Sequence, residues 1–239
     1  MQELGNKRVA SCRQAGGWVR GVRQVFVLFD LDGTLVDSGP AHRRAAESAF
    51  RQKGIAAVEE SLMRFLVAHD AASAGMRPDL YFEIWRRMQP LYRVEQESIL
   101  AFPGIGDALV QLLSLGIGAG VVTSKRRWAV ERELERLGWR DLFACVVCRE
   151  DTRRHKPSPE PILRAMDQIG QGALAYVGDA PSDVLAAKAA GLAAVGAAWG
   201  WTGGAALQAA GADWVLDAPS GLLPWLQGLG GPDLRQVEA

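Results

Sequence analysis

The sequence predicts an α/β fold, an open parallel sheet with helices on both faces, into which an all-helical segment is inserted. Three observations support this fold class. Short apolar runs are followed by polar turns and then by helix-like segments, which is the order of βα units. Several of these runs are apolar throughout, as expected of strands buried on both faces. Residues 38–100, in contrast, contain helical patterns and no strand pattern.

The first predicted strand, residues 25–29, leads directly into Asp30-Leu31-Asp32-Gly33. On extended backbone, side chains two residues apart point the same way, so Asp30 and Asp32 can reach one group at the carboxyl end of the strand. Two carboxylates that close are unfavourable without a cation between them, and Mg²⁺ is the usual cation where phosphate supplies further ligands. The pair indicates phosphoryl chemistry. The alternative is two ordinary turn acids beside Gly33.

The segment from Ser38 to Leu100 is predicted to be helical. Gly54 ends its first helix, and Pro90 is a candidate break in its third. The expected helices cover residues 40–53, 58–69 and 78–97.

The next predicted strand begins at Ile117 and ends in two hydroxyl side chains, Thr123 and Ser124, before a helix over about residues 127–137. Hydroxyls and free backbone N–H groups at the start of a helix suit a phosphate group. The alternative is that Thr123 and Ser124 only cap the helix.

Lys156 follows a predicted strand over residues 143–148 and immediately precedes a helix. We expect this helix to begin at Pro159, with Ser158 as its N-cap. The position places an ammonium group near the same edge of the sheet. The alternative is a solvated loop lysine.

A further predicted strand ends in Gly178-Asp179, and Asp183 follows four residues later. Both acids can face one site across the first helical turn. Asp183 alone is also explained as an acid favoured by the helix dipole. The remaining expected elements are a helix over residues 105–115 and strands at 193–198 and 213–216.

Each of these polar segments has an ordinary explanation when taken alone, but all four occur at strand ends. In an open α/β sheet, ligands bind outside the carboxyl ends of the strands. Their co-occurrence there favours one active site over four unrelated turns.

The four segments resemble the motifs of the haloacid dehalogenase superfamily, and specifically of its phosphatases. The resemblance covers most of the chain, from about Val25 to Trp201. The stretch from Gly178 to Gly200 is similar to the branch that contains phosphoglycolate phosphatases and pyrophosphatases. Ala180 departs from the pattern, because many relatives carry a hydroxyl or an amide there.

The resemblance implies a domain organisation. It consists of a Rossmann-like catalytic core, a helical cap that closes over the site to exclude water and select the substrate, and an amino-terminal extension that we expect to be disordered. The corresponding residues are 24–37 and 101–239 for the core, 38–100 for the cap and 1–23 for the extension.

The resemblance also implies a role for each motif residue. Asp30 would be the nucleophile that forms an aspartyl-phosphate, and Asp32 the general acid and then the base. Mg²⁺ would be held by the Asp30 carboxylate, the Asp32 backbone carbonyl and Asp179. The remaining roles are support of the metal ligands by Asp183, phosphoryl binding by Thr123, Ser124 and the Gly33 turn, and charge compensation by Lys156.

Composition is that of an ordinary globular enzyme. Of 239 residues, 49% are hydrophobic and 23% charged, and the formal net charge is +0. This balance argues against a nucleic-acid or membrane partner that depends on bulk electrostatics. Three cysteines, Cys12, Cys145 and Cys148, fit a reducing cytoplasm. On a strand, Cys145 and Cys148 point to opposite faces, so we do not expect them to share a metal or a disulfide.

The sequence therefore predicts a Mg²⁺-dependent phosphatase that hydrolyses a small phosphorylated metabolite, with phosphoglycolate as the first candidate. The alternatives are a sugar phosphomutase of the same fold, a pyrophosphatase and, less favoured, an inactive binding protein. A monomer and a homodimer are both left open. A second anionic group on the substrate has four candidate partners in the helical segment, Arg43, Arg44, Arg64 and Arg77. The alternative, which we favour for most of them, is that they are surface arginines.

Overall fold

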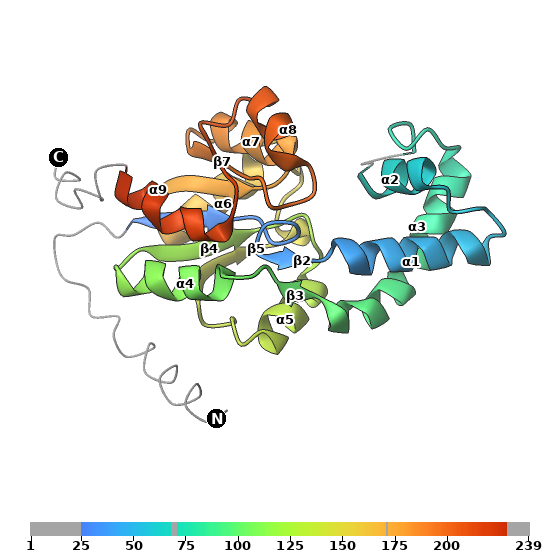
Figure 1. Ribbon diagram of the computed structural model, residues 1–239, viewed down its shortest axis with the longest axis horizontal. Helices are drawn as coiled ribbons and strands as arrows, with labels where there is room; N and C mark the ends of the chain where they lie inside the picture. The colour runs from blue at the N-terminus through green and yellow to red at the C-terminus, as the bar shows by residue number, and fades with distance from the viewer. Residues whose placement is uncertain (1–24, 68–70, 171, 229–239) are drawn as a thin grey trace.

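The computed structural model describes residues 25–67, 71–170 and 172–228 (Figure 1). The predicted extension, residues 1–23, lies outside the described residues. The centre of the fold is a six-stranded parallel sheet in the order β5-β4-β1-β6-β7-β8. Its strands are β1 (Phe26–Phe29), β4 (Gly118–Val122), β5 (Phe143–Val147), β6 (Ala173–Gly178), β7 (Ala193–Ala197) and β8 (Trp214–Leu216).

Alternate side chains of the central strand β1 belong to two hydrophobic cores, one on each face of the sheet. Val27 and Phe29 share a core with residues of α4 (Ile105–Ser114), α5 (Arg127–Arg136) and α9 (Leu222–Gly228). Leu28 shares the other core with residues of α6 (Glu160–Ile169), α7 (Pro181–Ala189) and α8 (Gly203–Ala209). The predicted α/β class, with helices on both faces of a parallel sheet, is confirmed.

The two cysteines of β5 and its end lie in different cores. Cys145 packs on the α6 side and Cys148 on the α4 side, and both are free thiols. The strand geometry separates them, as the sequence spacing predicts.

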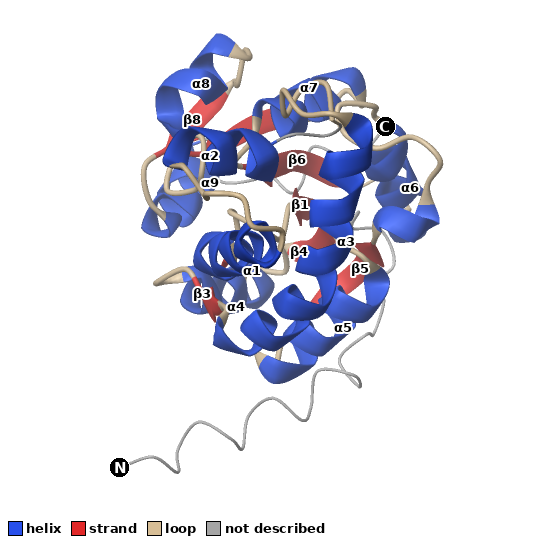
Figure 2. Cartoon of the chain, turned by 90° about the vertical axis from the view of Figure 1, so that its right-hand side faces the viewer, coloured by secondary structure: helices blue, strands red, loops and turns tan. Residues whose placement is uncertain are grey.

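The helical segment lies between two short strands, β2 (Val36–Asp37) and β3 (Leu100–Ala101). It contains α1 (Gly39–Gln52), α2 (Glu59–Val67) and α3 (Pro78–Glu95), which we call the helical insertion. In Figure 1 the insertion extends to the right of the sheet, and Figure 2 views the molecule from that side, with α1 and α3 in front of the strands. A short 3₁₀ helix, Gln96–Ser98, links α3 to β3.

Helix α3 continues through Pro90, so the candidate break is not present. Proline removes one backbone hydrogen bond inside a helix. Burial of one face of α3, on which Tyr81, Ile84, Met88 and Tyr92 lie, stabilises the helix on both sides of Pro90.

Strands β2 and β3 pair antiparallel, with Val36 opposite Ala101 and Asp37 opposite Leu100. The sequence pattern did not indicate this ladder, because two residues are too few to show alternation. The ladder holds the two connections of the helical insertion side by side where they leave and rejoin the sheet.

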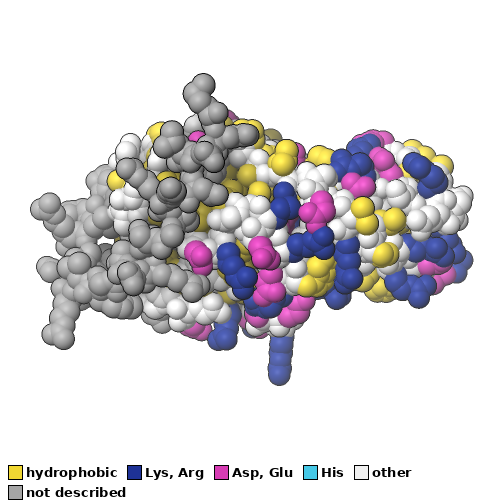
Figure 3. Space-filling model, turned by 90° about the horizontal axis from the view of Figure 1, so that it is seen from below, with side chains coloured by type: hydrophobic (Ala, Val, Ile, Leu, Met, Phe, Trp, Pro, Cys, Tyr) yellow, Lys and Arg dark blue, Asp and Glu magenta, His cyan; other side chains and the backbone are white. Residues whose placement is uncertain are grey.

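Within the described ranges, no helix combines the length and the apolar character that a bilayer crossing requires. On the face seen in Figure 3, basic and acidic side chains are interspersed and do not gather by sign.

Candidate active site

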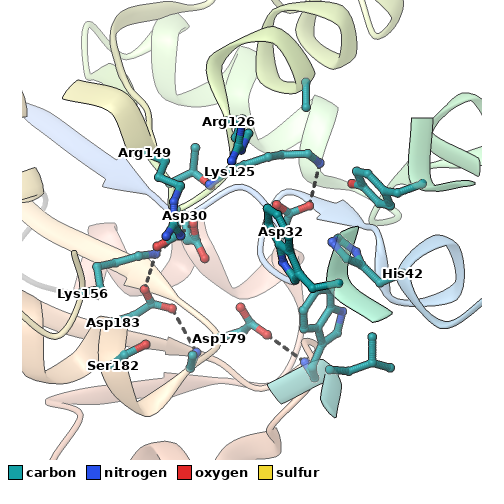
Figure 4. Close-up of a pocket in the computed structure, with 18 of the residues that line it drawn as sticks. Asp30, Asp32, His42, Lys125, Arg126, Arg149, Lys156, Asp179, Ser182 and Asp183 are labelled. Atoms are coloured by element: carbon teal, nitrogen blue, oxygen red, sulfur yellow. Dashed lines mark hydrogen bonds and ion pairs between the residues drawn. The ribbon is translucent and has the colours of Figure 1, made fainter. Parts of the chain in front are cut away.

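The polar segments singled out in the sequence meet at the carboxyl edge of the sheet (Figure 4). Asp30 follows β1, Thr123 follows β4 and Asp179 follows β6, and these three strands are neighbours in the sheet. Lys156 reaches the same place from the connection between β5 and α6. Together they line a cavity of about 540 Å³ between the sheet and the helical insertion.

Lys156 is the centre of a buried ion cluster. Its Nζ lies 3.0 Å from Asp30 Oδ1 and 2.6 Å from Asp183 Oδ1, and it donates a hydrogen bond of 3.0 Å to the Tyr176 hydroxyl. Although burial opposes it, Asp183 and Asp30 hold the pKa of Lys156 well above its usual value. The side chain is therefore a fixed cation beside Asp30 and is not a solvated loop lysine.

The helix after Lys156 begins one residue later than predicted. Helix α6 starts at Glu160, and Pro159 occupies the N-cap position. Ser158 Oγ accepts a 3.3 Å hydrogen bond from the Glu160 backbone N–H. The Ser158 hydroxyl thus accepts a backbone hydrogen bond at the start of α6, although Ser158 precedes the N-cap by one residue.

Three buried acids form a cluster around the end of β1. Asp30, Asp179 and Asp183 each place a carboxyl oxygen within 4.8 Å of the others. Asp30 Oδ1 accepts no hydrogen bond from the described residues, although it pairs with Lys156. An oxygen-only donor set of three buried carboxylates, faced by a single ammonium group, suits a hard divalent cation. Asp32 is not in this cluster, so its predicted share in metal binding rests on its backbone carbonyl.

Both oxygens of Asp183 already have partners. Oδ1 pairs with Lys156, and Oδ2 accepts a 3.0 Å hydrogen bond from the Ala180 backbone N–H. These contacts fix Lys156 and the start of α7. They fit the supporting role predicted for Asp183, which stays a prediction.

The cluster has a high affinity for protons in the absence of a cation. Burial raises the pKa of Asp30 to about 8, with Lys156 opposing the shift and the neighbouring carboxylates adding to it. Burial also raises the pKa of Asp179 to about 6, against the hydrogen bond from the Trp201 backbone. Protonation relieves the repulsion between the buried carboxylates, and a bound divalent cation would relieve the same repulsion without the protons.

We expect Mg²⁺ to stabilise the protein more at high pH than at low pH. Because the folded pKa of both carboxyls exceeds 3.8, the folded state binds more protons than the unfolded state, and the unfolding free energy falls as pH rises toward about 8. The measurement is the Tm of EDTA-treated protein with and without Mg²⁺ at about pH 5.5 and about pH 8.5, on either side of this window. A larger Mg²⁺-induced shift at the lower pH contradicts the expectation.

Gly33 is needed where the loop after β1 packs against Asp179. Its φ is +80°, and a Cβ added there would lie 2.3 Å from Asp179 Oδ2. Only glycine combines this left-handed backbone with so close an approach. The turn therefore shapes the acid cluster as well as the predicted phosphoryl site.

Thr123 and Ser124 both line the cavity. Thr123 is buried, and its Oγ1 accepts a 3.2 Å hydrogen bond from the Lys125 backbone N–H. Ser124 is exposed to the cavity. The two residues thus line the same cavity as Asp30, at the end of the neighbouring strand, and their role in phosphoryl binding stays a prediction.

Asp32 lies in a second ionic cluster that the sequence analysis missed. Its Oδ1 accepts hydrogen bonds from Ser38 Oγ at 2.5 Å and from Lys125 Nζ at 2.8 Å. Although burial raises it, Lys125 and His42 hold the pKa of Asp32 below its ordinary value. In Figure 4, Lys156 meets Asp30 on one side of the site and Lys125 meets Asp32 on the other.

Lys125 is held in place by Glu133, a fully buried acid of α5. Glu133 Oε2 lies 2.5 Å from Lys125 Nζ, and burial raises the pKa of Glu133 to about 7. The burial of Glu133 is not evident from the sequence, because residues 131–136 are mostly charged and such a run is typical of a solvent-exposed helix face. The available signal was that Glu133 shares one helix face with Ala129 and Val130.

Replacing Glu133 by alanine should destabilise the fold, because Lys125 would lose one of its two buried partners. Breaking a buried pair in this way costs about 3 kcal/mol or more. Urea unfolding measures the loss, and Glu131→Ala, an exposed acid on the same helix, is the matched control, expected to change stability by about 0.5 kcal/mol or less. Equal losses in the two variants would refute the role of the pair.

The family described as haloacid dehalogenase-like hydrolase matches residues 27–197, which contain all four of the polar segments that follow the strands. The chain belongs to this family. The phosphoglycolate phosphatase of Yersinia pseudotuberculosis is 31% identical over 231 residues, covering 89% of this chain and 96% of the relative. That of Synechococcus elongatus is 33% identical over 216 residues, covering 82% of this chain and 94% of the relative. The predicted resemblance and the prediction of a hydrolase are both confirmed.

Solved structures share the fold of this haloacid dehalogenase-like hydrolase. A predicted phosphoglycolate phosphatase from Haemophilus somnus superposes with a TM-score of 0.75 at 24% identity, covering 86% of this chain and 99% of that chain. A hydrolase from Pseudomonas syringae gives a TM-score of 0.73 at 26% identity, with the same coverage.

Proposed function

We propose that this hydrolase is a Mg²⁺-dependent phosphatase that transfers the phosphoryl group of a small phosphorylated metabolite to Asp30 and then to water. The observation that carries the proposal is the buried acid cluster around Asp30, with Lys156 Nζ 3.0 Å away. Phosphoglycolate is the first candidate substrate, because the curated relatives above are phosphoglycolate phosphatases. The proposed setting is the cytoplasm, without a nucleic-acid or membrane partner and with the chain as a monomer or a homodimer.

Each residue of the site has a chemical task in this proposal. The Asp30 carboxylate attacks phosphorus in line, and Lys156 compensates the negative charge that gathers there. Asp32 gives a proton to the leaving oxygen and later accepts one from the attacking water. Against the effect of burial, Lys125 and His42 lower its pKa in the unliganded protein, and the negative charge of a bound phosphate would raise that pKa so that Asp32 enters the first step protonated. When bound by Asp30, Asp179 and the Asp32 backbone carbonyl, Mg²⁺ supplies charge neutralisation for the phosphoryl oxygens.

The helical insertion is proposed to act as the cap over this site. Its α1 and α3 approach the Asp32 side of the cavity, where the rings of His42 and Tyr92 lie 4.3 Å apart. Lys125 Nζ lies 5.5 Å from the Tyr92 ring. Movement of the insertion on the β2–β3 ladder would therefore alter the surroundings of Asp32 and exclude water.

Phosphate release from a panel of metabolites tests the proposal. The panel contains phosphoglycolate, pyrophosphate, sugar phosphates and an activated aryl phosphate, each with and without Mg²⁺. We expect Mg²⁺-dependent release that is fastest with phosphoglycolate. Hydrolysis of the aryl phosphate alone would support phosphatase activity but reject phosphoglycolate as the substrate. No phosphate release from any compound of the panel would reject phosphatase activity.

A further inference from the structure

A second cleft opens beside the active-site cavity, where the helical insertion meets the start of α5. It holds about 240 Å³ and is lined by Trp85, Gln89, Pro90 and Arg93 of α3 and by Arg126 and Trp128 next to Ser124. Four of these residues, Trp85, Gln89, Arg126 and Trp128, also line the active-site cavity. The cleft therefore continues the active-site cavity outward.

Two arginines and two tryptophans of the cleft stack reciprocally across the junction. Arg93 of the insertion lies over the ring of Trp128, with its Cζ 4.5 Å from the ring centroid. Arg126 lies over the ring of Trp85 of the insertion, at 5.6 Å. Stacking fixes the plane of a guanidinium group and leaves its N–H edge free to donate hydrogen bonds.

Neither guanidinium has a carboxylate partner among the described residues, and this distinguishes the pair from most arginines of the insertion. The four arginines that the sequence suggested for a second anionic group are all engaged with acids: Arg43 with Glu47 and Glu59, Arg44 with Glu95, Arg64 with Glu60, and Arg77 with Asp79. None of the four lines the cavity or the cleft. They are therefore surface arginines, which is the alternative that the sequence left open, and their charges are met by neighbouring acids.

We propose that Arg93 and Arg126 bind a second anionic group, a carboxylate or a phosphate, on the leaving group of the substrate. Two pre-oriented forks with free N–H edges match the two or three oxygens of such a group. The inference rests on the proposed function, because it places the phosphoryl end of the same molecule at Asp30. It defines the substrate class as phosphomonoesters whose alcohol carries a further negative charge.

A purely structural clasp between the insertion and the core is the competing explanation. Stacking of this kind holds surfaces together without regard to the charge of the substrate. The two explanations separate when two substrates share one carbon skeleton and differ in the second anionic group.

Matched substrate pairs provide the test. Phosphoglycolate and ethyl phosphate share a two-carbon skeleton and differ in the carboxylate, and fructose 1,6-bisphosphate and fructose 6-phosphate differ in the second phosphate. The KM of each is measured with Mg²⁺ for the wild type, Arg93→Gln and Arg126→Gln. The matched control is Arg132→Gln, an α5 arginine that pairs with Glu97 and lies outside both cavities.

We expect each cleft variant to raise the KM of the doubly charged member of at least one pair by about tenfold, with the KM of its partner changed by about twofold or less. The pair that responds identifies the second group as carboxylate or phosphate. Arg126→Lys should retain part of the wild-type preference for the doubly charged substrate, because lysine keeps the positive charge but lacks the two-pronged guanidinium. Arg132→Gln should change neither substrate.

Two results would overturn the inference. Equal KM increases for both members of a pair would show a structural clasp, and unchanged KM values for all substrates would show that the arginines do not touch the ligand. Binding of phosphoglycolate and ethyl phosphate to Asp30→Asn protein, followed by calorimetry, gives the same comparison without turnover. This binding comparison distinguishes failure of phosphatase activity from failure of the anion site. Preferential binding of phosphoglycolate over ethyl phosphate, lost in Arg126→Gln, supports the site. Equal binding of phosphoglycolate and ethyl phosphate rejects it.

Discussion

Asp30→Asn is expected to lower kcat by about 10⁴-fold or more on every phosphorylated substrate, because an amide is a poor nucleophile. The substitution is nearly isosteric, and Lys156 keeps its second partner, Asp183, at 2.6 Å. The fold should survive, since burial already disfavours the charge of Asp30 and raises its pKa to about 8. Initial rates and Tm, measured on the same preparation, separate lost chemistry from lost structure.

The control for Asp30→Asn is Asp107→Asn, which changes an exposed acid in the first turn of α4. It should retain wild-type rates. Activity of Asp30→Asn within about tenfold of the wild type would remove Asp30 from the role of nucleophile.

Asp32→Asn is expected to slow alkyl phosphates far more than an activated aryl phosphate. An alkoxide leaving group needs the proton that Asp32 supplies, and general acid catalysis contributes about 10²–10⁴-fold. An aryl oxide leaves without that proton, so its first step should change by about tenfold or less. The amide can still meet Ser38 Oγ and Lys125 Nζ, which lie 2.5 and 2.8 Å from Asp32 Oδ1.

The comparison needs kcat for ethyl phosphate and for an aryl phosphate in the wild type and in Asp32→Asn. Single-turnover kinetics isolate phosphoryl transfer to the enzyme from the later attack of water, in which Asp32 also takes part. Losses of equal size on the two substrates would argue that Asp32 only organises the loop after β1.

The sheet and the motif positions could be predicted because local patterns determine them. Strand β1 is apolar on both faces and ends directly before Asp30, and parallel strands bring their carboxyl ends to one edge of the sheet whatever loops connect them. Tertiary packing decided what local patterns could not. Pro90 remains inside α3 because the buried face of α3 outweighs one lost hydrogen bond, and the β2–β3 ladder is too short to leave a pattern.

The surroundings of Asp32 could not be predicted because they depend on pairings between distant elements. Lys125 and Asp32 are 93 residues apart in the chain. Glu133 lies in a run of charged residues, and such runs are typical of a solvent-exposed helix face. The sequence also could not show which arginines pair with an acidic side chain and which do not. Arg43 and Arg126 look alike in the chain, but only the structure shows that Arg43 pairs with Glu59 and that Arg126 stacks on Trp85.

Chemical capture of the phosphoryl group on Asp30 tests the proposed mechanism most directly. The protein is incubated with phosphoglycolate and Mg²⁺, quenched, and treated with borohydride, which reduces an aspartyl-phosphate to homoserine, and its peptides are analysed by mass spectrometry. We expect homoserine at position 30, dependent on substrate and absent in Asp30→Asn. Turnover of the substrate with no change at Asp30, or with the change at another residue, would contradict it.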